Sequence, residues 1–405
     1  MKRRYSFPVH LAGAAVARTG DEMSGPALML AGLAMTGSTA DASLLLAGVT
    51  VSAVLGGPVL GSLLDRAARP GRLLAAALAL YAAGLTAVLV GLGRLPFALT
   101  LAAAVLTGLL GPALSGGWTA QLPVVVRGER LDRANALDAM TFGAAGLAGP
   151  ALAGGAAEAL GAPAAVVVSA VLVALALPAA WALPVRADPV PGGPPPDALL
   201  SRGPVASPAA DLAAGIRAVV GRPALARATL TSVLSCTAQG MLTACLALLG
   251  ERVLGGAGRG AMLLSCTAAS ALAASAVLAR FPRAIAPDTI LWTGALVQAA
   301  LPAAALLGHP GVLVAAALVA GTGEGPQLVA LFAVRHREAP DRLRSQIFTT
   351  GAGLKTTGFA LGAAVAGPVA ARSLSGALLL AAGTAVLAAL AFFAVPAPGD
   401  RAVPV

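Results

Sequence analysis

The chain has 405 residues, of which 58% are hydrophobic and only 11% are charged, against a usual charged share of about 25%. So few charges cannot cover a water-soluble protein of this length, and the composition therefore excludes a soluble globular fold. The formal net charge of +10 is divided among short gaps between apolar runs, which excludes the continuous basic face that nucleic-acid binding requires.

The apolar runs predict the fold class. A helix needs about 20 apolar residues to span a bilayer, and twelve runs meet this need. We predict an all-α membrane protein with twelve transmembrane helices in two six-helix halves. The expected spans are 7–35, 42–64, 72–93, 96–122, 136–160 and 163–184, followed by 224–249, 259–280, 288–308, 311–333, 346–371 and 374–396.

A proline-rich stretch separates the sixth span from the seventh. Eight prolines lie between Pro184 and Pro208, a composition typical of an extended linker. We expect a linker at 185–211, with its cytoplasmic segment reaching residue 222. It would divide the chain into an N-terminal half, 1–184, and a C-terminal half, 212–405.

The two halves repeat a short pattern in corresponding helices. Asp132 stands before the fifth span and precedes Gly149 by the same spacing that separates Asp341 from Gly358 in the eleventh. Many secondary transporters consist of two six-helix halves in parallel repeat, with the substrate site between the halves near the middle of the membrane. The repeat therefore favours a transporter.

The positions of the basic residues predict the orientation in the membrane. The connections between apolar runs form two alternating sets. Of the 27 Lys and Arg residues, 21 lie in one set or at the two ends of the chain, four arginines lie in the other set, and two basic residues lie inside apolar runs. Lys and Arg resist translocation, so we expect both termini in the cytoplasm. Lysine is scarce beside arginine, and Ala, Gly and Pro are abundant, which suggests GC-rich coding and a bacterial plasma (inner) membrane.

Two local patterns lie at the end of the second span and inside the fifth. Gly61-Ser-Leu-Leu-Asp65-Arg66 ends the second span, with Arg69 and Arg72 after it. Such a carboxylate can accept from a nearby arginine or face the positive N-terminus of another helix. The fifth span contains Gly146, Gly149, Pro150, Gly154 and Gly155. Small residues let helices approach closely, and a proline bends its helix.

These patterns resemble the major facilitator superfamily, in its bacterial drug- and metabolite-exporter-like branch. Two further stretches share the resemblance: Arg18-Thr-Gly-Asp21 in the first span, and Gln121-Leu-Pro123 before Ala134-Asn135-Ala136-Leu137-Asp138. The first pattern is similar to the cytoplasmic loop motif, with Ala68 where glycine is usual. The fifth-span pattern is similar to the exporter motif Gly-Pro-x-x-Gly-Gly, with one extra residue. The resemblance implies that Asp65 and Arg66 lock the cytoplasmic face shut, and that the fifth helix belongs to an exporter.

Five ionisable residues lie at membrane depth, where charges are costly and indicate function: Arg18, Asp21, Glu22, Glu324 and Lys355. Arg18 can reach either acid of its own helix, which follow it by three and four residues. Lys355 and Glu324 can pair between helices. Three acids face two bases, so one acid lacks a partner and can carry a proton.

The resemblance assigns Asp21 to Arg18, which leaves Glu22 as the first choice for the proton-carrying acid and Glu324 as the second. The alternative is one static polar network of all five charges that only stabilises the bundle.

The sequence thus predicts a monomeric secondary transporter that exports small amphipathic molecules, with protons as the coupling ion, by alternating access. An importer or uniporter remains open, as does a polytopic membrane enzyme acting on lipid-linked substrates. No aqueous His or Asp cluster and no phosphate-binding loop with lysine occurs, so we expect no enzyme and no cofactor.

The arginine distribution makes one direct prediction. A reporter fused at residue 200 should lie in the cytoplasm, whereas one fused beside Arg94 should be translocated. Paired cytoplasmic and periplasmic reporters measure both positions. Periplasmic activity at residue 200 would contradict the whole topology.

Overall fold

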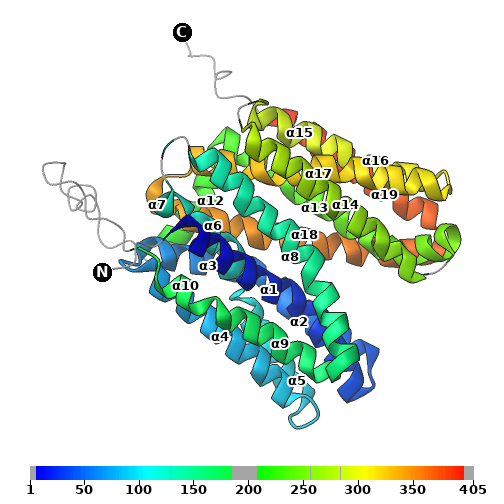
Figure 1. The fold of residues 1–405 in the computed structure, drawn as a ribbon, viewed down its shortest axis with the longest axis horizontal. Helices are drawn as coiled ribbons and strands as arrows, with labels where there is room; N and C mark the ends of the chain where they lie inside the picture. Colours follow the sequence, from blue (N-terminus) through cyan, green and yellow to red (C-terminus); the bar gives the residue numbers. More distant parts are fainter. Residues whose placement is uncertain are drawn as a thin grey trace, which may run out of the picture.

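The computed structural model describes residues 6–395 apart from residues 127, 129, 185–207, 256 and 283. Every regular element in this described part is helical (Figure 1). The backbone of a helix satisfies its own hydrogen bonds, which a segment surrounded by lipid requires. The predicted all-α fold class is therefore confirmed.

The N-terminal half follows the expected order of spans, with its second, fourth and sixth spans interrupted. Pro112 precedes a π-helical turn in the fourth span, where proline removes a backbone donor. The elements are α1 (Phe7–Thr36), α2 (Thr39–Val51), α3 (Ala53–Arg66), α4 (Pro70–Gly91), α5 (Phe97–Gly108), η1 (Ala113–Gly117), α6 (Trp118–Ala120), α7 (Leu122–Val125), α8 (Arg130–Leu160), α9 (Ala162–Leu175) and α10 (Leu177–Trp181).

The C-terminal half repeats this arrangement after one additional helix. Its ninth span is interrupted after Gln298. The elements are α12 (Pro208–Gly221), α13 (Pro223–Leu249), η2 (Gly250–Leu254), α14 (Ala257–Arg280), α15 (Pro287–Gln298), α16 (Ala300–Ala305), α17 (Pro310–Glu338), η3 (Asp341–Leu343), α18 (Arg344–Arg372) and α19 (Leu374–Ala394).

A helical segment lies at each of the twelve expected positions. In the described part of the chain, nine helical segments are long and apolar enough to cross a membrane. Neither α1 nor α18 is among them, because Arg18, Asp21 and Glu22 lie within two turns of α1, and α18 carries Lys355 with several Thr and Gly residues. Four of the five candidate charges thus lie on these two helices, and Glu324 lies on α17, which is among the nine.

The expected linker needs one correction. Residues 208–221 form helix α12, although the extended linker was predicted to reach residue 211 and its cytoplasmic segment residue 222. This stretch begins with Pro208 and is rich in alanine, which favours helix, and the dense prolines lie before it. The rest of the predicted linker, 185–207, lies outside the described residues.

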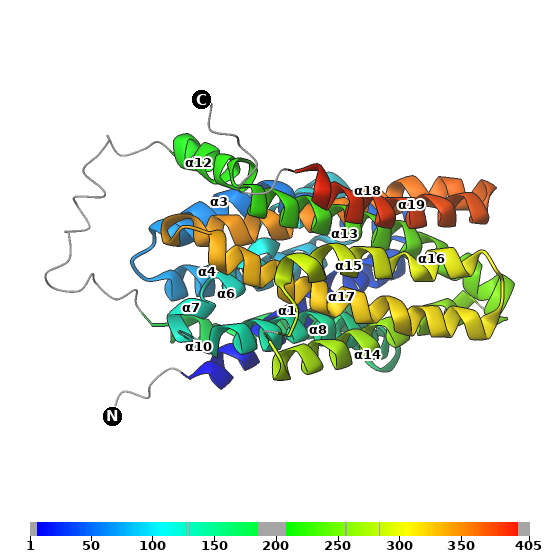
Figure 2. The ribbon, with the colours of Figure 1, turned by 90° about the horizontal axis from the view of Figure 1, so that it is seen from above.

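The two halves lie side by side and meet mainly through α3 against α18 and α8 against α14 (Figures 1 and 2). Glycines permit this close packing. A Cβ on Gly57 of α3 would lie 2.5 Å from the Thr349 carbonyl oxygen of α18, and one on Gly116 would lie 2.5 Å from the Phe348 carbonyl oxygen. The halves therefore touch backbone to backbone on this side.

Candidate functional site

Arg18 lies at the centre of a buried polar cluster that joins α1, α6 and α8. Its guanidinium forms an ion pair with Asp138, with 2.9 Å between Nη1 and Oδ1, and both side chains are almost fully buried. It donates to the hydroxyls of Thr119, at 2.8 Å, and Thr141. The ring of Phe142 covers it at 3.7 Å from the guanidinium carbon. Thr119 donates a further hydrogen bond to Asp138. Paired and hydrogen-bonded charges of this kind tolerate burial.

This arrangement corrects the predicted partner of Arg18, which was Asp21 or Glu22. Side chains on a helix lean toward its N-terminus, so Arg18 leans away from two acids that follow it in the chain. Arginine before an acid is also the weaker order for a pair along one helix. The signal for Asp138 was present in the sequence, because it lies inside the span expected at 136–160.

Asp21 faces α4 within the same half. The hydroxyl of Tyr81 donates to Asp21 Oδ1 at 2.7 Å, and Ser24 shares a hydrogen bond with the same hydroxyl at 2.9 Å. Tyr81 is buried. A neutral hydroxyl thus takes the place that the sequence assigned to a cation.

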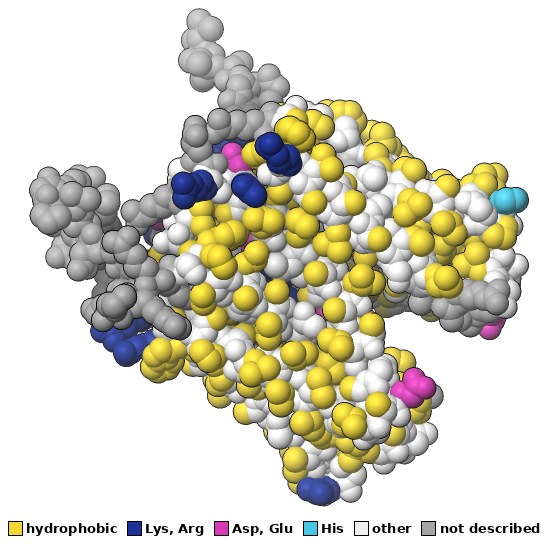
Figure 3. Space-filling view, in the orientation of Figure 1, with side chains coloured by type: hydrophobic (Ala, Val, Ile, Leu, Met, Phe, Trp, Pro, Cys, Tyr) yellow, Lys and Arg dark blue, Asp and Glu magenta, His cyan; other side chains and the backbone are white. Residues whose placement is uncertain are grey.

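Glu22, Lys355 and Glu324 form what we name the cavity charges. They lie near the middles of α1, α18 and α17, and Lys355 acts electrostatically on both acids. Glu22 is exposed, whereas Lys355 and Glu324 are half-buried. Among the described residues Lys355 forms no direct ion pair with either acid. Figure 3 shows a notch between the two lobes of the molecule at the end remote from the chain termini. Two acids from opposite halves are thus matched by one lysine at mid-helix.

A chain of glutamine side chains leads to Glu324 through the C-terminal half. Gln239 of α13 donates to Gln298 Oε1 at 3.0 Å, and Gln298 donates to Gln327 Oε1 at 2.9 Å. Gln327 in turn donates to the hydroxyl of Ser235 at 3.1 Å. The Gln239 side chain also interacts with the Glu324 carboxylate. The amides therefore connect the cavity charges to the interior of this half.

Backbone carbonyls fix the direction of this chain. Gln327 Nε2 donates to the Leu291 carbonyl at 3.0 Å, and Gln298 Nε2 donates to the Gly294 carbonyl at 3.0 Å. A carbonyl oxygen only accepts, so each amide nitrogen must face it. Gln239 can therefore present only a donor to Gln298.

Asp65 joins the two halves at the end of the bundle where α1 begins. Its Oδ1 accepts from the backbone N–H of Ser345 at 2.9 Å, and its Oδ2 accepts from that of Gln346 at 2.8 Å. These donors open α18, whose N-terminus carries partial positive charge. Gly61 lies against the Gln346 backbone, where a Cβ would overlap it. The structure thus contains the predicted geometry in which Asp65 faces the positive N-terminus of another helix. We name this contact the latch.

The three arginines of the loop motif lie on the surface next to the latch. Arg66, Arg69 and Arg72 are exposed where α3 turns into α4. The Arg72 guanidinium lies 5.3 Å from the centre of the Trp181 ring. Their positions suit a solvated membrane surface more than a buried site.

Aromatic rings fill the interface near the latch. The rings of Phe142 and Phe332 lie 5.5 Å apart, and those of Phe332 and Phe348 lie 5.8 Å apart, so the series crosses from α8 to α17 and α18. Arg335, which the sequence placed in a cytoplasmic connection, is instead 1% exposed and lies 5.7 Å from the Phe348 ring centre. The long helix α17 continues beyond the expected end of its span, so its last turns are inside the bundle.

The glycines of the fifth-span pattern differ in their surroundings. Only Gly149 is tightly packed, since a Cβ there would lie 2.7 Å from the Glu22 Cβ. Pro150 lies within α8 without ending it. The positions Gly146, Gly154 and Gly155 have open space where a Cβ would stand.

The repeat seen in the sequence corresponds to equivalent contacts. Gly149 of α8 lies against Glu22 of α1, the first helix of its half. Gly358 of α18 lies against α13, the first spanning helix of the other half, with Thr237 Oγ1 at 3.0 Å and the Val233 carbonyl at 3.1 Å from a Cβ there. Each half therefore packs its fifth span onto its first through a glycine.

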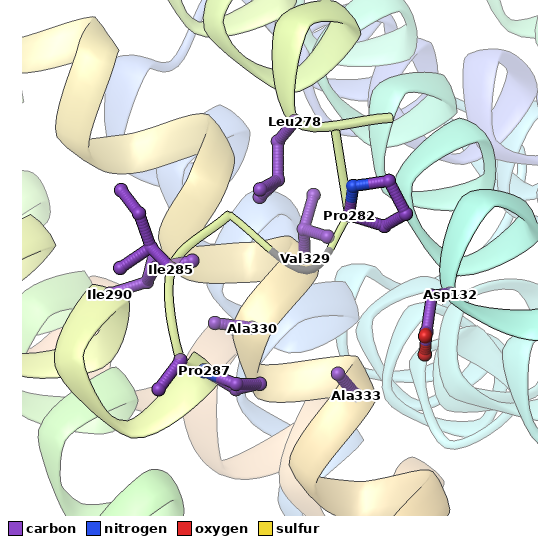
Figure 4. A pocket seen from close by; sticks show the side chains of 10 residues that line it. Asp132, Leu278, Pro282, Ile285, Pro287, Ile290, Val329, Ala330 and Ala333 are labelled. Carbon is purple, nitrogen blue, oxygen red and sulfur yellow. The ribbon is translucent and has the colours of Figure 1, made fainter. Parts of the chain in front are cut away.

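A separate pocket of about 240 Å³ lies away from these charges, between α8 and the helices α14, α15 and α17. Figure 4 shows the Asp132 carboxylate on one side and apolar side chains such as Leu278 and Val329 on the other. None of the cavity charges lines it.

The comparisons with known proteins agree with this architecture. The family model of the Major Facilitator Superfamily matches residues 11–352. The chain belongs to the Major Facilitator Superfamily. An uncharacterized MFS-type transporter of Sinorhizobium fredii is 38% identical over 95 residues, which is 24% of this chain and 23% of that protein.

Solved transporters of the superfamily share the fold along almost their whole lengths. A bacterial homologue of the iron transporter ferroportin, in an outward-facing state, has a TM-score of 0.73 at 17% identity, covering 96% of this chain and 98% of that one. The human organic anion transporter MFSD10 has a TM-score of 0.72 at 15% identity, with 96% and 99% covered. The fucose:proton symporter FucP of E. coli has a TM-score of 0.69 at 15% identity, with 98% and 100% covered.

Membership in the superfamily makes the chain a multi-pass membrane transporter. The cavity charges lie at mid-helix on spanning helices of both halves.

The ion pair of Arg18 leads to a stability prediction. Asp138→Asn leaves a buried guanidinium without its counter-charge and should lower the free energy of unfolding by about 3–5 kcal/mol. Asp21→Asn should cost much less, because the Asn oxygen can still accept from Tyr81. Thermal unfolding of both variants in the same detergent is the measurement. Equal losses would contradict the assignment of Arg18 to Asp138.

The latch leads to a conformational prediction. Asp65→Asn removes the charge at the N-terminus of α18 and should weaken the closed end by about 1 kcal/mol, or about fivefold in its equilibrium. Spin labels at Ala68→Cys and Arg342→Cys, in a background without the native cysteines, measure the separation of the halves. The same change at Asp41, in the first turn of α2, is the control. An unchanged distance distribution in Asp65→Asn would reduce the latch to a surface contact.

Proposed function

We propose that this transporter exports small amphipathic molecules in exchange for protons by alternating access, and that Glu22 carries the proton. The observation that supports it most is the placement of two acids and one cation, Glu22, Glu324 and Lys355, near the middles of three spanning helices. One cation balances one carboxylate, so the other acid needs a proton or a cationic substrate. A proton and a cationic substrate therefore compete for the unbalanced acid, and this competition couples proton movement to substrate transport.

Glu22 is the first candidate for the proton-carrying acid on grounds other than those that the sequence supplied. The sequence reached it by giving Asp21 to Arg18, and that pairing is wrong. Glu22 is exposed, whereas Asp21 accepts a hydrogen bond from a tyrosine. An acid that is exposed at mid-membrane can exchange a proton with an aqueous phase that reaches it. Glu324 is the second candidate.

Alternating access gives each observed contact a role in the proposal. The latch and the Thr349 hydroxyl, which donates to the Gly57 carbonyl at 2.5 Å, hold one end closed while the notch opens the other. With the termini in the cytoplasm, the open end faces outward. Opening of the closed end requires Asp65 to leave the N-terminus of α18. Export as the direction is supported by the resemblance of the glycine pattern in α8 to that of exporters.

The proton site is tested with Glu22→Gln, which keeps the shape and fixes the neutral form. Substrate exchange across proteoliposomes should persist, whereas efflux driven by a pH gradient should fall at least tenfold. Glu158→Gln is the matched control, because Glu158 is an exposed acid of the same half that lies near the C-terminal end of α8.

The outcomes separate the remaining assignments. Full gradient-driven efflux in Glu22→Gln with loss in Glu324→Gln would move the proton to Glu324. Gradient-driven efflux in both would remove proton coupling through these acids. Uptake without any pH gradient would replace the exporter by an importer or uniporter.

A further inference from the structure

Helix α12 is not one of the twelve spanning segments, yet it touches both halves. It contacts α3 of the N-terminal half and α13 and α18 of the C-terminal half. Figure 2 shows it on the outer side of the bundle beside α3. It therefore lies at the same end as the latch, across the line where the halves meet.

The inner face of α12 is fitted to the latch. Gly215 is buried against the side-chain amide of Gln346, where a Cβ would overlap. The backbone N–H of this same Gln346 donates to Asp65. The next turn of α12 packs Ala218 and Val219 against the apolar cluster of Leu225, Ala339, Leu343 and Ile347. When the halves separate at this end, α12 must lose its contact with at least one of them.

Hydrogen bonding fixes the end of α12 to the C-terminal half. Arg222, directly after the helix, donates to the backbone carbonyl of Glu338 at the end of α17. This bond ties the chain directly after α12 to the C-terminal half, so the contact of α12 with α3 is the one that we expect opening to break.

The outer face of α12 is apolar where the protein does not cover it. Ile216 and Val220, one turn apart, are 48% and 71% exposed. With about 100° between successive residues, the apolar arc runs on from buried Gly215 and half-buried Val219 to these two. Arg217 borders the arc on its exposed side. Helix α3, which α12 contacts, also has exposed apolar side chains, among them Val59 and Leu63. The apolar arc of α12 is thus wider than the part of it that the rest of the protein covers.

We propose that α12 is an interfacial helix that binds a membrane surface containing anionic lipid and, when bound, stabilises the closed end of the transporter. Ile216 and Val220 enter the boundary of the acyl chains, as the apolar face of such helices does. Arg217 lies at the level of the headgroups, where a basic residue is attracted to anionic lipid. The lipid surface holds α12 in the position that covers Gln346 and touches α3. The proposal rests on the alternating-access cycle and not on its direction or coupling ion.

The test measures the separation of the halves without any substrate. The full chain, spin-labelled at Ala68→Cys and Arg342→Cys, is placed in nanodiscs of phosphatidylcholine alone or with phosphatidylglycerol added. Phosphatidylglycerol should raise the ratio of closed to open forms about fivefold, the effect expected of one arginine near an anionic surface. Arg217→Gln should abolish this dependence, and Val220→Gln should reduce the closed population in both lipid mixtures.

Matched controls exclude general effects of the substitutions. Arg94→Gln and Leu307→Gln make the same changes at exposed positions near the opposite end of the bundle and should leave the lipid dependence intact. All four variants replace exposed side chains, so each should elute as the parent does on size exclusion.

Three results would overturn the proposal. A distance distribution that is the same in both lipid mixtures would remove the lipid partner. A shift toward the open form with phosphatidylglycerol would reverse the coupling. A dimer in phosphatidylcholine that Val220→Gln dissolves would assign the apolar arc to a second copy of the chain. None of these results depends on Glu22, so failure here and failure of the proton site are distinguishable.

Discussion

Hydrocarbon offers no partner to a charged side chain, and this constraint arranges the polar residues of the whole bundle. Arg18 meets it with Asp138 and two threonine hydroxyls, and so is held in the interior of one half. Asp65 meets it with the backbone donors of a helix end. The cavity charges meet it incompletely, since one lysine stands against two acids. The first arrangement joins helices within a half, the second joins the halves at one end, and the third leaves a charge to be balanced from outside the protein.

The fold could be predicted from the sequence because the length of an apolar run depends on bilayer thickness alone. A helical segment lies at each position where a run was expected, and the glycine pair of the repeat marks equivalent contacts. The errors fall at helix ends. Arg335 was assigned to a connection because α17 continues past its apolar run, and α12 was missed because prolines nearby suggested an extended chain.

The candidate site was predictable in its membership and less so in its pairing. Spacing along α1 placed Arg18 near Asp21 and Glu22, but the lean of helical side chains directs it to another helix. Such contacts join residues far apart in the chain, so the spacing of residues along one helix does not predict them. The amide chain shows the same limit. Each glutamine was visible inside a span, whereas the order in which they bond depends on how α13, α15 and α17 pack.

The glutamine chain has a consequence for how one half can respond to its neighbour. Its amides donate in a single sense, because two backbone carbonyls admit only nitrogen. An amide that turned over would set oxygen against oxygen on one side and nitrogen against nitrogen on the other, so the three groups keep one polarity together. They form a string of aligned dipoles that carries orientation without carrying charge. The acid beside Gln239 is thus held by a neutral framework with one permitted polarity, and this framework extends across three helices.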